Sequence, residues 1–511
     1  MSTQQRPPTY GAWRRPQSGG AFGASFAATI LTMGAAVVVI LAFALTRSLL
    51  VTGLLIAASA AVLVPMLVSD DGLSGTRRLS GWRSSLLSRR RGEDVYSSGA
   101  FSRVPGGLLR LPGVLAGTEL YESIDSDGRP FAMIHMPDKH LYTVPLAAEP
   151  QGGENFDQVH LDRAVANWGQ QLTSFTTTGD IPLVVAVLDT VPDTGTVLLE
   201  TVRARVRRDA PLLARQSMYE TATGTSKRGI RLAARLSITF EAQTADRRRD
   251  PAEQAVEIAT RLGDITRAAA AAGVICTPMT ADEIVGTVRR SYDPAALEAV
   301  EAALYSGEGT GQSWADAGPR THFRKPDRYF HESAVSVTWE MRVAPKRAVP
   351  ERVLERLIRP HPELPYKRVA IVYRPHKAAE GADVADSDYR NAAARRTGRT
   401  GLQKQADIND ERAANLVQQE QALGHGLTRF AVLITVTEPD GRTELIPRMN
   451  AILRDISTQA LLEVRVSKHW QDAAFAVGQA GQGRVIGGGH PDARKVHPGV
   501  RNPHPPPPPR S

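Results

Sequence analysis

Carboxylate pairs are the residues of this sequence that come closest to a catalytic or metal-binding pattern. Asp125 and Asp127 form a DxD triplet, which could hold a divalent ion in an enzyme that acts on a nucleotide or a sugar. The triplet precedes Gly128 in an expected hairpin turn, where Asp is favoured for its own backbone hydrogen bonds. Asp189 and Asp193 stand where a strand meets a helix, and could bind a cation or cap that helix. The context favours the turn and the cap, and a nucleotide or sugar enzyme remains the alternative.

Motifs for other kinds of catalysis are missing from the sequence. It contains no GxxxxGK[ST] phosphate loop, no HExxH zinc motif and no GxSxG nucleophile elbow. The fragment HESAV at His331 lacks the second histidine of a zinc motif. The single cysteine, Cys276, lies in the apolar run VICTPM, which predicts a buried, inert thiol and excludes a disulfide framework. We therefore expect no enzyme activity, no cofactor and no metal.

Two groups of basic residues could bind anionic partners. The stretch THFRKPDRYFH, 321–331, mixes Arg324, Lys325 and Arg328 with aromatic residues, which is compatible with base stacking and phosphate contacts. It also fits an exposed entry into the next strand, so nucleic acid is the less favoured partner. Six arginines could contact anionic lipid headgroups or act only as a topology signal; they are Arg77, Arg78, Arg83, Arg89, Arg90 and Arg91.

A long apolar segment, 25–68, is interrupted by a single charge, Arg47. Each half has about 20 residues, the length that crosses a hydrocarbon core of about 30 Å as a helix. The segment therefore predicts a two-helix transmembrane hairpin with its turn at 46–48. Arginines flank both ends, which predicts a two-span plasma-membrane protein with both termini and the remaining chain in the cytoplasm.

The 511 residues, 42% hydrophobic and 23% charged with a net charge of +9, suffice for two or three domains. Composition divides the chain into a basic tail, the hairpin, a basic linker, two α/β regions and a proline-rich tail expected to be disordered. The corresponding ranges are 1–24, 25–68, 69–113, 114–311 (which includes a β-meander), 312–480 and 481–511.

A similar unit occurs twice in the two α/β regions. LTRFAVLITVTEPDG, 427–441, has the pattern of IRLAARLSITFEAQT, 230–244, and a β-α-β-α-β order surrounds each. The fold class expected is α/β (α+β) with duplicated, ferredoxin-like subdomains behind the transmembrane hairpin; coincidence is the alternative, since this order is common. The strand LTRFAVLITV is apolar on both faces, so either its own helices or a partner must cover each face.

Several blocks resemble components of secretion and conjugation machines. YSSGAFSRVPGG and LYESIDSDGRPFAMIHMPDKHLYTV, behind a two-span hairpin, resemble a family of actinobacterial membrane proteins of conjugation and secretion gene sets. GIRLAARLSITFEA and ITRAAAAAGVICTPMTADEI are similar in style to EccE, a membrane component of type VII secretion. AVSVTWEMRVAPKRAVPERVLERLI, KRVAIVYRP, LTRFAVLITVTEPDGRTELIPRMNAILRDIS and QDAAFAVGQAGQG, within 333–483, resemble the amino-terminal domain of type IV secretion ATPases. In that family an ATPase core follows this domain, whereas here the tail expected to be disordered follows it, so we expect no motor activity from this chain.

The resemblance implies a non-catalytic, membrane-anchored docking subunit of a secretion or conjugation machine. Its expected partners are other subunits of that machine, including a separate motor ATPase, and anionic lipid; self-association is left open. A membrane-tethered nucleic-acid binder is a further alternative beside the nucleotide or sugar enzyme.

Overall fold

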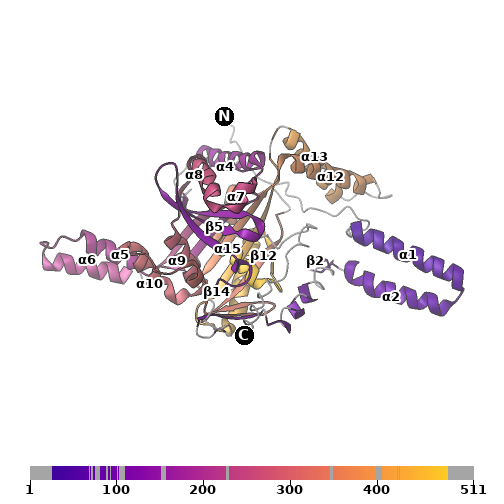
Figure 1. Cartoon of the computed structure of the whole chain (residues 1–511), viewed down its shortest axis with the longest axis horizontal. Coiled ribbons are helices and arrows are strands. Elements are labelled where there is room, and N and C mark those ends of the chain that lie inside the picture. Colours follow the sequence, from indigo (N-terminus) through magenta and orange to yellow (C-terminus); the bar gives the residue numbers. More distant parts are fainter. Residues whose placement is uncertain are drawn as a thin grey trace, which may run out of the picture.

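The computed structural model is organised around one large β-sheet from which helical hairpins extend (Figure 1). The described residues are 26–67, 69–70, 73–74, 81–83, 85–87, 90–92, 94–99, 102, 110–150, 157–225, 229–345, 349–397, 405–422, 424 and 426–480. The predicted tails 1–24 and 481–511 lie outside them, so the expected disorder of the second tail stays a prediction.

The sheet has 13 strands, and every pairing in it is antiparallel. Its inner strands are rich in Val, Ile, Leu and Thr, the residues that pack best on a pleated surface. The strands are β3 (Val95–Ser97), β4 (Glu119–Ile124), β5 (Pro130–Met136), β6 (Leu141–Pro150), β7 (Leu183–Pro192), β8 (Ile230–Glu241), β9 (Val274–Pro278), β10 (Thr321–Arg324), β11 (Tyr329–His331), β12 (Ala334–Val343), β13 (Lys367–Pro375), β14 (Thr428–Glu438) and β15 (Glu463–Val466). A separate two-stranded sheet pairs β1 (Ser69–Asp70) with β2 (Leu73–Ser74).

The order of the strands reads as a palindrome about one central pair. It runs β10-β11-β12-β14-β13 and then β7-β8-β6-β5-β4, with β3 beyond β10, β15 paired to β12 and β9 paired to β6. Each strand of the second half (312–480) thus has a counterpart in the first half (114–311), and β15-β12-β14-β13 corresponds to β9-β6-β8-β7. A pseudo-two-fold axis passes between β7 and β13, which pair from Lys367↔Thr190 to Tyr373↔Val184.

The helices also occur in matching places of the two halves. The first half contains α4 (Gln158–Thr178), α5 (Thr196–Arg205), α6 (Leu212–Thr225), α7 (Ala245–Arg249), α8 (Pro251–Ala271), α9 (Ala281–Tyr292) and α10 (Leu297–Ser306). The second contains α11 (Glu355–Ile358), α12 (Ala378–Thr397), α13 (Gln405–Ala422), α14 (Ile446–Gln459) and α15 (Gln471–Ala480). Local signals start them: Asp250 caps α8 before Pro251, and Thr280 with Glu283 forms a capping box on α9.

Helices cover both faces of the sheet. On one face, α4 and α8 bury a core against Val184 and Ile238, and α14 buries a second core against Ile434. On the other face, Phe475 and Val477 of α15 pack on the sheet, and α9 packs beside α15. Because alternate residues of a strand point to opposite faces, an inner strand covered in this way is apolar on both.

Strand β14 shows this arrangement directly. Val432 and Ile434 face the core under α14, whereas Leu433 packs with α15 and Thr435 bonds Thr338 on β12. All of these side chains are buried. The helices of the chain itself therefore cover the strand on both faces.

Helices α1 (Phe26–Thr46) and α2 (Leu49–Leu67) form a hairpin that lies apart from the sheet (Figure 1). Their large apolar side chains are exposed. Among the described residues, however, no helix has the length and apolarity needed to cross a membrane. On this finding the predicted transmembrane hairpin is wrong, and so is the two-span plasma-membrane location with cytoplasmic termini that depends on it.

The expected fold class also needs correction where the two α/β regions meet. Separate ferredoxin-like subdomains would each end in an open sheet edge, but β7 and β13 pair with each other over seven residue pairs. The backbone groups of both edges are thereby satisfied, and the halves share one sheet. The region boundary expected at 311/312 falls between α10 and the short 3-10 helix at Trp314–Ala317.

Candidate functional site

The central strand pair carries a group of buried charges, which we call the seam cluster: Asp189, Arg235, Arg290, Ser291 and Arg368. Asp189 on β7 lies opposite Arg368 on β13 in the register, and Arg235 on β8 points to the same face. The capping box of Thr280 and Glu283 starts α9, and Arg290 and Ser291 lie at its other end, where Oγ of Ser291 accepts a hydrogen bond from Arg368. Both halves of the molecule thus contribute side chains.

Two arginines use both oxygens of the Asp189 carboxylate. Nε of Arg368 donates to Oδ1 (2.6 Å), and Nη1 of Arg235 contacts Oδ2 (2.8 Å). Nη2 of Arg368 donates to Oγ of Ser291 (2.6 Å), and Nη2 of Arg235 donates to the carbonyl of Gly478 on α15 (3.0 Å). The side chains of Asp189 and Arg235 are each only 5% exposed. Because each oxygen of Asp189 contacts an arginine, the carboxylate is engaged in ion pairs and not available to a metal ion.

Burial and the neighbouring charges both shift the pKa values of the cluster. Burial alone would raise the pKa of Asp189, but Arg368, Arg235 and Arg290 together outweigh it and hold that pKa below its usual value. Burial lowers the pKa of Arg290 to about 10; Asp189 opposes the shift, and Arg235, Arg231 and Arg368 add to it. Three guanidinium groups therefore share one carboxylate.

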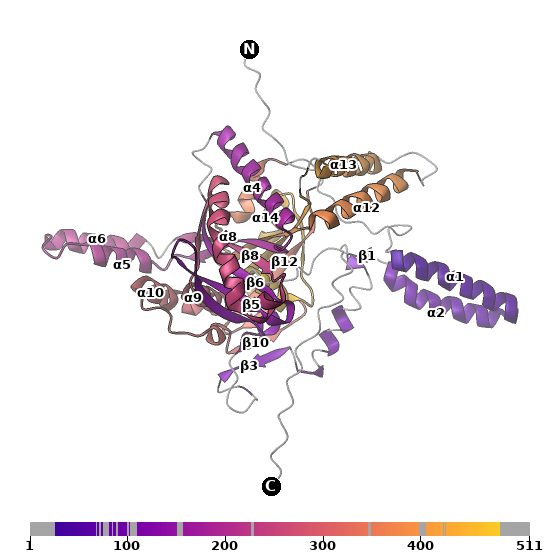
Figure 2. The same ribbon diagram turned by 45° about the horizontal axis from the view of Figure 1, so that its top comes forward.

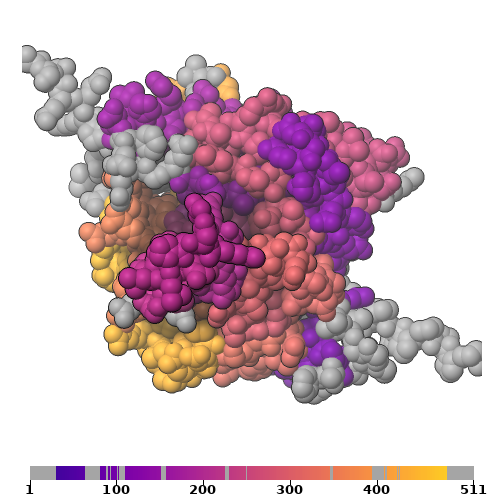
Figure 3. All heavy atoms as spheres, turned by 90° about the vertical axis from the view of Figure 1, so that its left-hand side faces the viewer, coloured from indigo at the N-terminus to yellow at the C-terminus, as the bar shows by residue number. Residues whose placement is uncertain are grey.

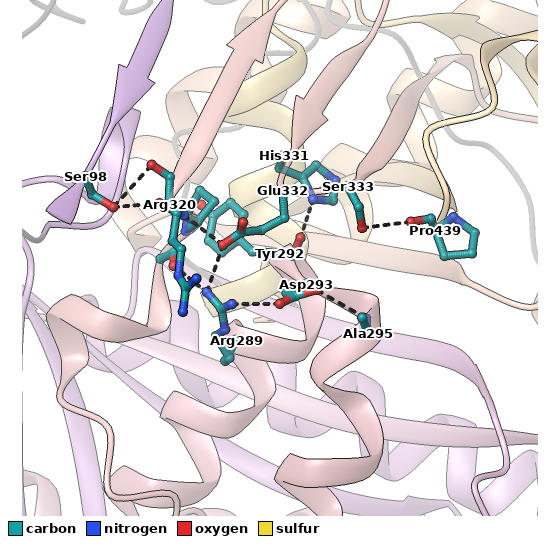
Figure 4. Close-up of polar contacts among 12 residues, drawn as sticks. Ser98, Arg289, Tyr292, Asp293, Ala295, Arg320, His331, Glu332, Ser333 and Pro439 are labelled. Carbon is teal, nitrogen blue, oxygen red and sulfur yellow. Dashed lines mark hydrogen bonds and ion pairs between the residues drawn. The ribbon is translucent and has the colours of Figure 1, made fainter. Parts of the chain in front are cut away.

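A second network joins the end of α9 to the turn between β11 and β12 (Figure 4). Arg289 donates from Nη2 to Asp293 (2.7 Å) and from Nη1 to Glu332 (3.1 Å), whose carboxylate also accepts the backbone N–H of Arg320 (2.8 Å). Glu332 has a φ of +48°, a left-handed conformation that these bonds hold in place. His331 lies between the carbonyl of Tyr292 (2.5 Å) and Oγ of Ser336 (2.7 Å). These contacts link α9 of the first half to strands of the second.

The predicted carboxylate pairs do not converge on a common site. Oδ1 of Asp125 accepts the backbone N–H groups of Asp127 (2.9 Å) and Arg129 (2.8 Å), and the Arg129 side chain contacts both aspartates. Oδ1 of Asp193 accepts the N–H of Gly195 (2.9 Å) at the start of α5, whereas Asp189 belongs to the seam cluster. The first pair therefore stabilises a turn, and the members of the second are used separately.

No metal or nucleophile site emerges from the remaining titratable groups that the structure describes. Within those ranges, no three His, Cys, Asp or Glu residues lie close enough to hold a metal ion. Cys276 is buried, and burial raises the pKa of its thiol to about 11. Such a thiol carries almost no thiolate at neutral pH.

The predicted basic residues are engaged in different ways. Arg324 pairs with Asp472 (3.1 Å), Arg328 with Asp327 (2.7 Å), and Nζ of Lys325 lies 5.1 Å from the centre of the Phe330 ring. Their role in nucleic-acid binding stays a prediction. Of the six arginines considered for lipid contact, Arg83, Arg90 and Arg91 are exposed, and Arg77, Arg78 and Arg89 lie outside the described residues.

Two helical arms project from the sheet at equivalent points of the two halves. Arm 1 is α5–α6, between β7 and β8, and arm 2 is α12–α13, between β13 and β14. They extend to opposite sides of the molecule (Figures 1 and 2), and arm 1 stands out from the body when viewed end-on (Figure 3). On arm 1, Leu212 is 71% and Leu213 79% exposed. One side of α6 carries a shallow groove lined by Leu212, Arg215, Gln216, Tyr219, Glu220 and Thr223.

Sequence reasoning missed the seam cluster almost entirely. The sequence pattern places Asp189 only beside Asp193, whereas its partner Arg368 is 179 residues away. One signal was present: Arg231 and Arg235 interrupt the apolar strand IRLAARLSITF on a single face, which indicates charge inside the fold. Nothing in the sequence identifies the carboxylate that pairs with this buried charge.

Comparison with known proteins adds one match. Residues 17–77 match the model of a family described as a domain of unknown function (DUF8461). The matched segment includes α1 and α2 and ends before the large sheet. No curated protein matches the chain.

Proposed function

We propose that this chain is a non-catalytic docking subunit of a larger assembly and that arm 1 binds a partner protein. The supporting observation is the set of large apolar side chains on arm 1, with Leu212 and Leu213 each more than two-thirds exposed on a projecting helix. Exposed apolar groups gathered on one projecting element are characteristic of interaction sites. The resemblance to secretion and conjugation components suggests the class of assembly.

The partner surface that fits arm 1 is the apolar face of a helix. Leu212, Gln216, Tyr219 and Thr223 recur along α6 at spacings of three and four residues, so they form one stripe. Arg215 and Glu220 border this stripe with opposite charges. A helix docked along such a stripe gains affinity from the leucine and tyrosine and orientation from the charges.

Substitution of the two exposed leucines of arm 1 tests this proposal. In the full-length chain, L212S and L213S together should weaken partner binding by about tenfold or more, because the partner would bury much less apolar area on arm 1. The matched control is V256S on α8, where Val256 is 64% exposed on the body of the molecule. The measurement is the amount of partner retained on purification, with circular dichroism as the check on folding. Equal retention in the double variant and the wild type would contradict the proposal.

ATP binding separates this proposal from the enzyme alternative. The sequence lacks the loop of backbone N–H groups and the lysine that cradle nucleotide phosphates. We therefore expect calorimetry on the full-length chain to show no saturable binding of ATP and a phosphate-release assay to show no hydrolysis. Saturable binding at micromolar affinity would contradict a docking role.

A further inference from the structure

The seam cluster contains more positive charge than the surrounding protein balances. Arg235, Arg290 and Arg368 carry three positive charges, and Asp189 is the carboxylate that favours the charged form of Arg290 among the described residues. Other nearby acids have partners of their own, since Glu301 pairs with Arg231 and Asp193 caps a turn. A buried charge without a counter-charge destabilises the folded state, so an anion bound beside these arginines would stabilise it.

The seam cluster also contains a hydrogen-bond donor that no described residue uses. Both oxygens of Asp189 are occupied, yet Nη1 of Arg368 is buried without a hydrogen-bond partner among the described residues. The guanidinium of Arg368 is held in position by Asp189 and Ser291, and it lies 5.6 Å from the centre of the Phe475 ring. Arg290 is half-buried beside Ser291 at the end of α9, and it is near enough to Asp189 for that carboxylate to favour its charged form.

We propose that the seam cluster binds a small tetrahedral oxyanion, such as free phosphate or sulfate, between Arg290 and the unused Nη1 of Arg368. Planar guanidinium groups donate parallel hydrogen bonds that match the oxygens of such an ion. The deep position of the cluster favours a free ion over a phosphate carried by a larger molecule. Because β7, β8, β13 and α9 all contribute to the cluster, the bound ion would stabilise the junction of the two halves.

The test is a titration of the full-length chain with inorganic phosphate and with sulfate, at ionic strength held constant with chloride. The melting temperature should rise saturably with either ion, because a ligand that binds only the folded state stabilises it. In R290Q the affinity should fall by about tenfold or more, since a charge-assisted hydrogen bond is lost. R368K keeps the charge but removes the planar donors, and it should lose affinity to a similar degree.

The control is R267Q, which removes an exposed arginine paired with Asp264 on α8 and should leave the response to phosphate unchanged. Without any oxyanion, R290Q should be at least as stable as the wild type, because it removes buried like-charge repulsion. No oxyanion effect in the wild type, or an equal effect in R290Q, would overturn the proposal. A response to ATP that R290Q abolishes would still assign a phosphate to the cluster, but from a nucleotide, and would contradict the docking function instead.

Discussion

At the scale of single residues, the buried ion pairs of the seam cluster are contacts that connect the two halves of the sheet. Asp189 holds Arg235 and Arg368, which come from different strands, and so joins the two halves at their shared edge. Removing one partner of a buried ion pair costs more than the pair itself contributes, because the remaining charge stays buried.

The first prediction concerns that carboxylate. D189N should lower the free energy of unfolding by about 3–5 kcal/mol, since two buried guanidinium groups lose their counter-charge. Denaturation by urea would measure the loss. The control D264N removes an exposed ion pair with Arg267 and should cost under about 1 kcal/mol. Because the pKa of Asp189 is lowered in the folded state, its contribution is complete above about pH 4 and is lost as the pH falls through the folded value.

The second prediction concerns His331, whose ring is fully buried between Tyr292 and Ser336. Burial lowers its pKa from 6.5 to about 4, so the folded protein holds it neutral while the unfolded chain protonates it. Stability is therefore complete above pH 6.5 and falls by about 3 kcal/mol as the pH drops to about 4. Unfolding measured across this range should show a shallower slope in H331Q. The same slope in both proteins would show that other groups cause the pH dependence.

At the scale of elements, the double coverage of β14 decides what its residues can do. Its sequence is apolar on both faces, which alone leaves open whether a partner or the chain's own helices provide the cover. In the structure α14 lies on one face and α15 on the other. The proposed binding of a partner would then use other elements, and arm 1 carries the most exposed large apolar side chains outside α1 and α2, Leu212 and Leu213.

The third prediction tests this assignment residue by residue. V432A, L433A and I434A should each lower stability, by up to about 2–5 kcal/mol, because each leaves a cavity in a packed core. T435A should also destabilise, because it leaves Thr338 without its bonded hydroxyl. Thermal unfolding and partner retention should be scored separately for each variant. A variant that loses the partner but keeps the wild-type melting temperature would show that β14 is part of the docking surface.

These elements also show how far the sequence could predict the fold. The runs of Val, Ile and Thr and the cap at Thr280 are local, so strands and helices could be located from neighbouring residues. The pairing of β7 with β13 depends on residues about 180 positions apart, which no local pattern records. For the same reason Asp189 could be singled out, but the arginines that hold it could not.

At the scale of the whole molecule, the palindromic sheet makes the two halves depend on each other. Each half buries a long central strand edge in the other, and Phe475 of the second half packs against Tyr292 of the first. An exposed edge of that length in an isolated half would pair with any available strand.

The fourth prediction follows from this dependence. Fragments 114–311 and 312–480, expressed separately, should aggregate or self-associate through β7 or β13, whereas co-expression should yield a one-to-one complex. Size-exclusion chromatography with light scattering distinguishes these states. Stable monomeric fragments would show that the shared edge is not required for folding.

The pseudo-two-fold axis has a further consequence for the arms. In a symmetric dimer of identical chains, any change to one arm appears in both, so both ends must present the same surface. Here both halves belong to one chain, and the arms differ: α6 begins with two leucines, whereas α12 and α13 are mostly polar. The two arms therefore present unlike surfaces on opposite sides of the molecule. Under the docking proposal, such a chain would hold two different neighbours at once, which a symmetric dimer with identical ends cannot do.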